Sequence, residues 1–160
     1  NRKEASVKNC SVHGGKEDVI DVVRGNAFFK KDKFYPSDTK QTVTIKGSAN
    51  VTLNNCQFVG KSNKDRDIVI GDFTIYDAVD TKRPPTRVNI LNCSKLVNKN
   101  ERPLKVFVLH GEVETSDENV DIIKIPNFIV KAYFFIMRTF IISKERKKEA
   151  KHNLDISPDV

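Results

Sequence analysis

The chain has 160 residues, the size of one domain, and its 38% hydrophobic and 31% charged residues are typical of a globular fold. Twenty-eight Lys and Arg against 21 Asp and Glu give a net charge of +7, which suits acidic polysaccharide, nucleic acid or an anionic surface without choosing among them. This composition excludes a collagen, a coiled coil, a disulfide-stapled miniprotein and a multi-pass membrane protein. Because the sequence begins at Asn1 without a charged-then-apolar signal segment, we expect a processed protein or an excised piece.

Two columns of residues recur along the first 111 positions at matching intervals. One column has an Asn-Cys context at Cys10, Cys56 and Cys93, and Lys31–Phe34 has the same shape with Asp32 in the cysteine position. These four positions are separated by 22, 24 and 37 residues. The second column is a glycine that ends a short apolar stretch, and it comprises Gly25, Gly47, Gly71 and Gly111. Two columns that share the intervals 22 and 24 indicate a solenoid repeat.

The apolar stretches between these columns predict short β-strands. Each is rich in β-branched residues, alternates in twos and is bounded by Gly, Asn, Asp or Ser, and no sustained helical period occurs before residue 126. The expected strands are Val19–Val23, Val43–Ile45, Val51–Leu53, Ile68–Ile70, Val88–Leu91 and Val106–Leu109. This pattern favours an all-β fold, namely a right-handed parallel β-helix solenoid of about five coils. We expect this domain to cover residues 1–125.

The three cysteines are expected to be reduced and buried. They cannot all pair within one chain, and none has the CxxC spacing of a zinc site. In a β-helix each cysteine would pack inside as a small hydrophobic residue. The preceding asparagine would hydrogen-bond through its side-chain amide to the neighbouring coil.

Two runs rich in cations lie between Cys56 and Cys93. The first is 60–66, and the second is 77–87, which carries the Pro84-Pro85 pair and reads as an exposed loop. A β-helix carries its chemistry on loops outside the coils, so the cations of these runs are candidates for contacting an anionic substrate. They are Lys61, Lys64, Arg66, Arg83 and Arg87. The alternative interpretation is that of solvated basic loops.

The segment 126–151 differs from the rest of the chain. Of the 15 residues from Phe128 to Ile142, 12 are apolar, and the basic run Lys144–Lys148 follows them. Fifteen helical residues extend about 22 Å, less than the roughly 30 Å hydrocarbon core, so no transmembrane segment is expected. We expect a helix that begins near Pro126 and packs on the coils or caps their open end, followed by a flexible tail at 152–160. The alternative is a surface for self-association or for a membrane surface.

Three segments follow one another in a suggestive order. In Lys16–Gly25 an acid, three residues and Asp21 precede an Arg-Gly pair. Val51–Phe58 leads to a lysine loop and a strand that ends in Ile-Gly. In Asn100–Phe107 an Arg-Pro pair and a second basic residue precede a strand. Over roughly residues 17–111 these segments resemble the pectate lyases and their pectate-lyase-like parallel β-helix relatives.

The resemblance implies β-elimination of an acidic polysaccharide. Removal of the proton α to a uronate carboxylate requires that this carboxylate be neutralised, which calcium and basic side chains can do. By the resemblance, Glu17 and Asp21 would bind calcium. Lys64 and Lys105 would neutralise the substrate acid, and Arg102 would be the base, which requires a cationic site that displaces its proton. The alternative interpretations are solvated carboxylates and loop cations.

Two classes of function follow from these patterns. The first is a protein that acts on or binds acidic polysaccharide or another glycan, with calcium-assisted elimination as its most concrete form. The second is a non-catalytic β-helix module of a surface or fibre protein. Convergence of the candidate residues on one face favours the first class, and their dispersal favours the second. Nucleic acid is not an expected partner, because the cations are not interleaved with exposed aromatic residues. Both classes are typical of an extracellular, cell-surface or virion-surface protein.

Overall fold

The computed structural model describes residues 4–36, 40–71, 84–126, 128–133, 135–136 and 139–140. Within these residues the strands form three five-stranded sheets, here named A, B and C. Every strand pair in them is parallel except β11–β12. The prediction of an all-β fold is therefore confirmed.

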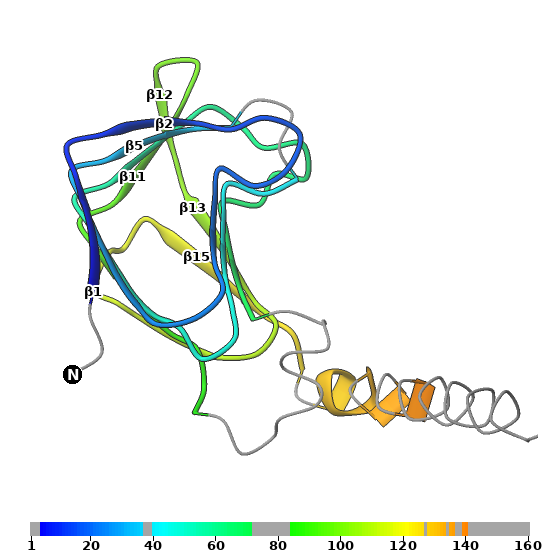
Figure 1. The fold of residues 1–160 in the computed structure, drawn as a ribbon. Coiled ribbons are helices and arrows are strands. Elements are labelled where there is room, and N and C mark those ends of the chain that lie inside the picture. Colours follow the sequence, from blue (N-terminus) through cyan, green and yellow to red (C-terminus); the bar gives the residue numbers. More distant parts are fainter. Residues whose placement is uncertain are drawn as a thin grey trace, which may run out of the picture.

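The chain visits the three sheets in rotation (Figure 1). In spatial order, sheet A comprises β1 (Glu4–Lys8), β4 (Asn26–Lys30), β7 (Asn50–Asn54), β10 (Arg87–Leu91) and β14 (Glu112–Thr115). Sheet B comprises β12 (Asn100–Arg102), β11 (Ser94–Val97), β8 (Gln57–Val59), β5 (Lys33–Tyr35) and β2 (Ser11–His13). Sheet C comprises β15 (Val120–Lys124), β13 (Leu104–Val108), β9 (Ile68–Ile70), β6 (Val43–Ile45) and β3 (Ile20–Val22). Apart from β12, each strand after the first round thus pairs with a strand formed one round earlier, which explains the repeat in the sequence.

The Asn-Cys column forms the bend between sheets A and B. Four residues there have left-handed backbones, at φ values of 55, 58, 53 and 52°, and they are Asn9, Lys31, Asn55 and Asn92. Asparagine tolerates this conformation better than most residues, which accounts for three of the four. The main-chain carbonyls of Cys10, Asp32 and Cys56 each accept a hydrogen bond from the following round, at 2.8–3.0 Å. The predicted stacking of these positions is confirmed.

Two details of the predicted ladder are wrong. Cys56 and Cys93 are buried, but Cys10 is exposed, because its round forms the edge of sheets A and B. The Asn55 side-chain amide donates to the side chain of Asn54 and not to a neighbouring round. The main-chain N–H of Asn55 makes the contact between rounds, at 2.8 Å from the carbonyl oxygen of Leu91.

The glycine column marks the return from sheet C to sheet A. Gly47 and Gly71 have φ values of 66 and 84°, a region that strongly favours glycine. A Cβ atom on Gly47 would collide with the carbonyl oxygen of Val23, and one on Gly71 would collide with the main chain of His110. Only glycine lets successive rounds approach this closely.

The core lies between the three sheets and is filled by the inward side chains of each round. On sheet B the inward column runs from Val12 through Phe34 and Phe58, with the two phenylalanine rings 5.1 Å apart. The next position in register is occupied by Lys95, which is 2% exposed. A cation thus occupies a position that is apolar in the earlier rounds.

A helix follows sheet C, as predicted from the apolar run. Residues 128–133, 135–136 and 139–140 are helical, and this segment extends away from the sheets (Figure 1). Among the ten described helical residues Val130 alone is buried, so these residues do not present the packed apolar face that the sequence led us to expect. No helix in the described part of the chain is long and apolar enough to span a bilayer.

Candidate functional site

A hollow of about 340 Å³ lies over the outer face of sheet C. Its floor contains Asp21, Thr44 and Val69, which are adjacent in register on β3, β6 and β9 and point away from the core. Side chains from the loops before and after these strands complete the wall: Glu17, Asp18, Lys40, Gln41, Lys46, Lys64, Arg66, Gly71 and Leu109. We call this hollow the sheet C groove. It contains three acidic and four basic side chains.

The acidic side chains of the groove are all engaged. Glu17 accepts two hydrogen bonds from Lys40, at 2.8 and 3.1 Å, and the hydrogen bond and charge of Glu17 raise the pKa of Lys40. Asp21 pairs with Lys46 at 3.1 Å. One Asp18 oxygen accepts hydrogen bonds from Thr44 and from Gln41, at 2.5 and 3.2 Å. Two lysines are thus committed to acids that belong to the groove itself.

Two cations of the groove remain available. Lys64 is exposed and Arg66 is half-buried, and among the described residues neither has a carboxylate partner. The Arg66 guanidinium lies over the ring of Phe107, 5.0 Å from its centroid, which fixes the side chain without neutralising it. The free positive charge of the groove is therefore concentrated on the loop between β8 and β9.

A compact turn holds this loop in place. The Ser62 hydroxyl donates to the carbonyl oxygen of Arg66 at 2.8 Å and accepts from the N–H of Arg66 at 2.9 Å. The N–H of Asp65 donates to the Ser62 carbonyl oxygen at 3.0 Å, and Asp65 has a left-handed backbone with φ of 51°. Ser62 is itself buried. Lys64 therefore projects from a hydrogen-bonded turn.

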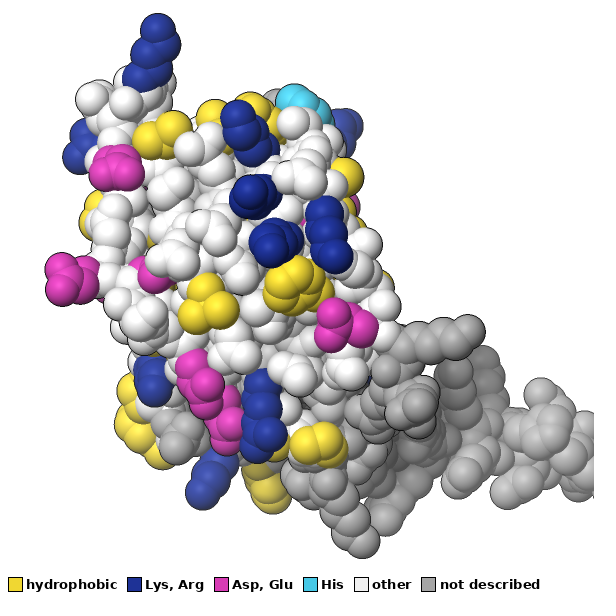
Figure 2. All heavy atoms as spheres, turned by 90° about the vertical axis from the view of Figure 1, so that its left-hand side faces the viewer, with side chains coloured by type: hydrophobic (Ala, Val, Ile, Leu, Met, Phe, Trp, Pro, Cys, Tyr) yellow, Lys and Arg dark blue, Asp and Glu magenta, His cyan; other side chains and the backbone are white. Residues whose placement is uncertain are grey.

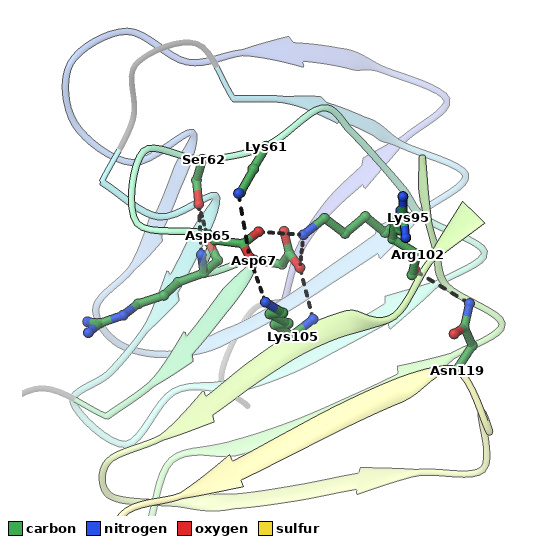
Figure 3. Close-up of polar contacts among 9 residues, drawn as sticks. Lys61, Ser62, Asp65, Asp67, Lys95, Arg102, Lys105 and Asn119 are labelled. Atoms are coloured by element: carbon green, nitrogen blue, oxygen red, sulfur yellow. Dashed lines mark hydrogen bonds and ion pairs between the residues drawn. The ribbon is translucent and has the colours of Figure 1, made fainter. Parts of the chain in front are cut away.

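An ion cluster lies beneath the same loop (Figure 3). The Lys95 Nζ, buried in the core column, is 2.8 Å from Asp67 Oδ2 and 3.3 Å from Asp65 Oδ1. Lys105 Nζ is 2.6 Å from Asp65 Oδ2, and the main-chain N–H of Lys105 donates to Asp67 Oδ2 at 2.8 Å. Lys61 reaches the edge of the cluster, 3.9 Å from Asp65. The cluster ties the loop to β11 and β13.

The two carboxyl groups of the cluster differ in pKa. Burial raises the pKa of Asp67, and the hydrogen bonds from Lys95 and from the Lys105 main chain offset this rise in part. At Asp65 burial acts in the same direction, but the hydrogen bonds and charges of Lys105 and Lys95 outweigh it and hold the pKa below its usual range. The Asp67 Oδ1 atom is buried without a hydrogen-bond partner among the described residues. The Asp67 carboxylate is thus stabilised through Oδ2, which accepts from Lys95 Nζ and from the Lys105 main chain.

The structure brings some of the predicted site residues together and separates others. Glu17, Asp21, Lys64 and Arg66 line one groove. Lys61 and Lys105 belong to the adjoining ion cluster. Arg102 is exposed on β12, apart from the carboxylates of the cluster, and its described hydrogen bond is a 3.4 Å contact from Asn119 to its carbonyl oxygen (Figure 3).

The remaining two predicted residues do not join the groove. Arg87 lies on the outer face of sheet A, in an ion pair with Glu112 at 2.9 Å. Arg83 lies outside the described residues. Figure 2 shows a separate group of basic side chains on the sheet A side. Of the lysines in the first two rounds, Lys8 and Lys30 are exposed on sheet A, Lys31 is exposed at the bend that follows β4, and Lys33 is exposed on sheet B.

The sheet C groove gives little support to the calcium prediction. Glu17 and Asp21 each face a lysine, and a cation would have to displace both lysines and find most of its six to eight oxygen ligands elsewhere. Among the described residues no group of three or more His, Cys, Asp or Glu side chains is arranged to hold a metal. We therefore derive no step that depends on calcium.

Sequence reasoning missed several residues of the site. No sequence motif predicted Lys40, Lys46 and Asp18 as site residues. They line the groove because the rounds stack on one another. Lys95 did carry a signal, because the fourth residue of its Asn-Cys-Ser-Lys context occupies the column position of Phe34 and Phe58. A lysine in an apolar column predicts a buried partner of opposite charge.

Comparison of the chain with protein-family models, curated proteins and solved structures gives no match. The resemblance to pectate lyases therefore stays a prediction.

Proposed function

We propose that the protein is a right-handed parallel β-helix that binds an acidic polysaccharide in the sheet C groove. The fold proposal is supported by the rotation of the chain through three sheets, with every round in parallel register with the next. The hand follows from the general preference of parallel crossover connections for the right-handed form.

The binding proposal depends on one observation, the pair of uncommitted cations Lys64 and Arg66 at the rim of a polar groove. An arginine held over an aromatic ring presents its N–H groups in a fixed plane, which matches the two oxygens of a uronate carboxylate. The side-chain carbonyl oxygen of Gln41, whose amide nitrogen donates to Asp18, supplies an acceptor for a sugar hydroxyl group. A polymer with one carboxylate per sugar could meet both cations at once.

Binding is favoured over elimination by the position of the candidate base. A base must come within about 3 Å of the proton that it removes. Arg102 is exposed on the β12 hairpin, and Lys105 is held by Asp65 at 2.6 Å, so neither residue lines the groove that contains Lys64. We therefore propose a non-catalytic binding function.

Calorimetric titration with polygalacturonate tests the proposal, with neutral dextran as the ligand control. We expect Lys64→Gln/Arg66→Gln to weaken binding of polygalacturonate by about ten-fold or more, because two charge-assisted contacts are lost. Lys30→Gln/Lys31→Gln is the matched control, since it removes the same charge from an exposed surface outside the groove. Equal weakening by both double variants would mean that net charge, and not the groove, attracts the polymer.

An absorbance assay for unsaturated uronate products, with and without calcium, separates binding from elimination. We expect no product. Product that disappears in Arg102→Ala would replace the binding function with the lyase function. Absence of both product and binding would leave a structural β-helix module as the better account.

A further inference from the structure

Large apolar side chains lie exposed on the helical segment that follows β15. Phe128, Phe135, Ile136 and Phe140 are 73, 72, 63 and 66% exposed, and Ile129 and Tyr133 are 44 and 36% exposed. Elsewhere in the described part of the chain, Leu91 at 36% is the one large hydrophobic residue with comparable exposure. Among the described residues, the exposed apolar surface is therefore concentrated on one short element.

The exposed residues form a continuous stripe along the helix. Ile129, Tyr133, Ile136 and Phe140 follow the spacing of four, three and four residues that places side chains on one helical face. Phe128 and Phe135, seven residues apart, lie on a neighbouring face, about 100° around the helix from Ile129 and Ile136. The helix leaves the body of the protein after β15 and extends away from the three sheets (Figure 1).

The segment also carries an unusual share of the charge. Residues 126–151 contain seven Lys and Arg against two Asp and Glu, whereas residues 1–125 contain 21 against 17. A sixth of the chain thus contributes more net positive charge than the whole three-sheet body. An apolar helical stripe combined with basic residues is the pattern of segments that lie in the interface of an anionic bilayer.

We propose that the segment formed by the helical residues 128–133, 135–136 and 139–140 docks on the surface of a bilayer that contains anionic lipid. The apolar stripe would enter the boundary between headgroups and acyl chains, while the surrounding basic residues, such as the exposed Lys131, would contact lipid phosphates. Anionic lipid is favoured over a second copy of the chain because two copies would bring together segments with the same strong positive charge. A neutral apolar partner would leave that charge without a role.

Co-sedimentation of the full chain with vesicles tests the proposal. We expect binding to phosphatidylcholine–phosphatidylserine vesicles at least about ten-fold tighter than to phosphatidylcholine vesicles, and weaker binding as salt is raised. Phe135→Ser/Ile136→Ser should reduce vesicle binding by about ten-fold or more, because it removes Ile136 from the stripe and the highly exposed Phe135 beside it. Both residues are exposed, so circular dichroism should show an unchanged β signal.

Two control variants make the result specific. Leu91→Ser removes an equally apolar residue from sheet A and should leave vesicle binding unchanged. Lys64→Gln/Arg66→Gln should also leave it unchanged, which separates this surface from the sheet C groove. Equal vesicle binding by the wild type and Phe135→Ser/Ile136→Ser would overturn the proposal. So would a concentration-dependent dimer in sedimentation velocity that these substitutions abolish, in a protein that does not bind the vesicles.

Discussion

The buried ion pair between Lys95 and Asp67 gives a prediction about stability. Both residues are nearly inaccessible, at 2 and 0% exposure, and their charged atoms are 2.8 Å apart. Lys95→Met would keep most of the side-chain volume and remove the charge, so the Asp67 carboxylate would stay buried without its cation. Such a loss typically costs about 3–5 kcal/mol. We expect about 3 kcal/mol, because the hydrogen bond from the Lys105 main chain to Asp67 remains.

The double variant Lys95→Met/Asp67→Asn separates the pair from its surroundings. It removes both charges and leaves an amide oxygen that can still accept from Lys105. Replacement of a whole buried ion pair by neutral side chains is often close to neutral, so we expect this variant to unfold within about 1 kcal/mol of the wild type. Recovery of stability on adding the second substitution would show that the cost of the first is an unpaired charge and not a packing defect.

Urea unfolding followed by circular dichroism measures both differences, with linear extrapolation to water. Lys33→Met is the matched control, because Lys33 is exposed on sheet B and should change the free energy of unfolding by less than about 0.5 kcal/mol. A loss below about 1 kcal/mol for Lys95→Met would refute the reasoning, since it would mean that Asp67 does not need its cation.

Three further predictions concern the turns, the thiols and the acid limit of stability. Gly47→Ala should destabilise the protein by about 2 kcal/mol or more, because the Gly47 backbone is left-handed and the new Cβ would collide with the Val23 carbonyl. Gly15→Ala is the control in the same urea assay, since no atom lies within 4 Å of a Cβ added there. Native-state labelling with a maleimide should modify Cys10 rapidly and Cys93 only after unfolding. Cys93 is buried, and the contact with the Cys56 thiol, together with burial, raises the pKa of the Cys93 thiol. Fast modification of Cys93 would contradict its position in the core. The pKa of Asp65 is lower in the folded state than in the unfolded state, so the ionised carboxylate stabilises the fold above the ordinary carboxyl pKa. This stabilisation is lost as pH falls through the pKa of Asp65 in the folded state. Asp65→Asn should therefore flatten the decline of the free energy of unfolding measured from neutral to acid pH.

The strands and bends were predictable from the sequence because they depend on residues that recur at a fixed interval. The Asn-Cys and glycine columns specify left-handed positions, and these positions fix where each round turns. The exposure of Cys10 was not predictable from its motif, since burial depends on whether another round covers it. The Asn-Cys column predicts where a residue lies within its round, but it does not predict whether that round lies inside the stack or at its end.

The groove was harder to predict because no local pattern joins its residues. Glu17 and Lys40 are 23 residues apart and meet because they occupy equivalent places in successive rounds. The resemblance grouped Glu17, Asp21 and Lys64 with Lys105 and Arg102. The first three line the groove, and the last two do not. Arg102 lies on β12, which forms an antiparallel hairpin with β11, and this hairpin places Arg102 away from the groove.

The buried ion pair has a consequence for the order in which the rounds assemble. Rounds that share the same columns could pair out of sequence and still form apolar contacts, because Val12, Phe34 and Phe58 are all apolar and equivalent in register. Lys95 removes this freedom. If β11 paired with β5 instead of β8, its ammonium group would stack on Phe34, and the Asp67 carboxylate would be buried alone. The ion pair therefore distinguishes one round from another. Strand pairing that skips a round would lose more free energy by burying unpaired charges than it would gain from the strand hydrogen bonds.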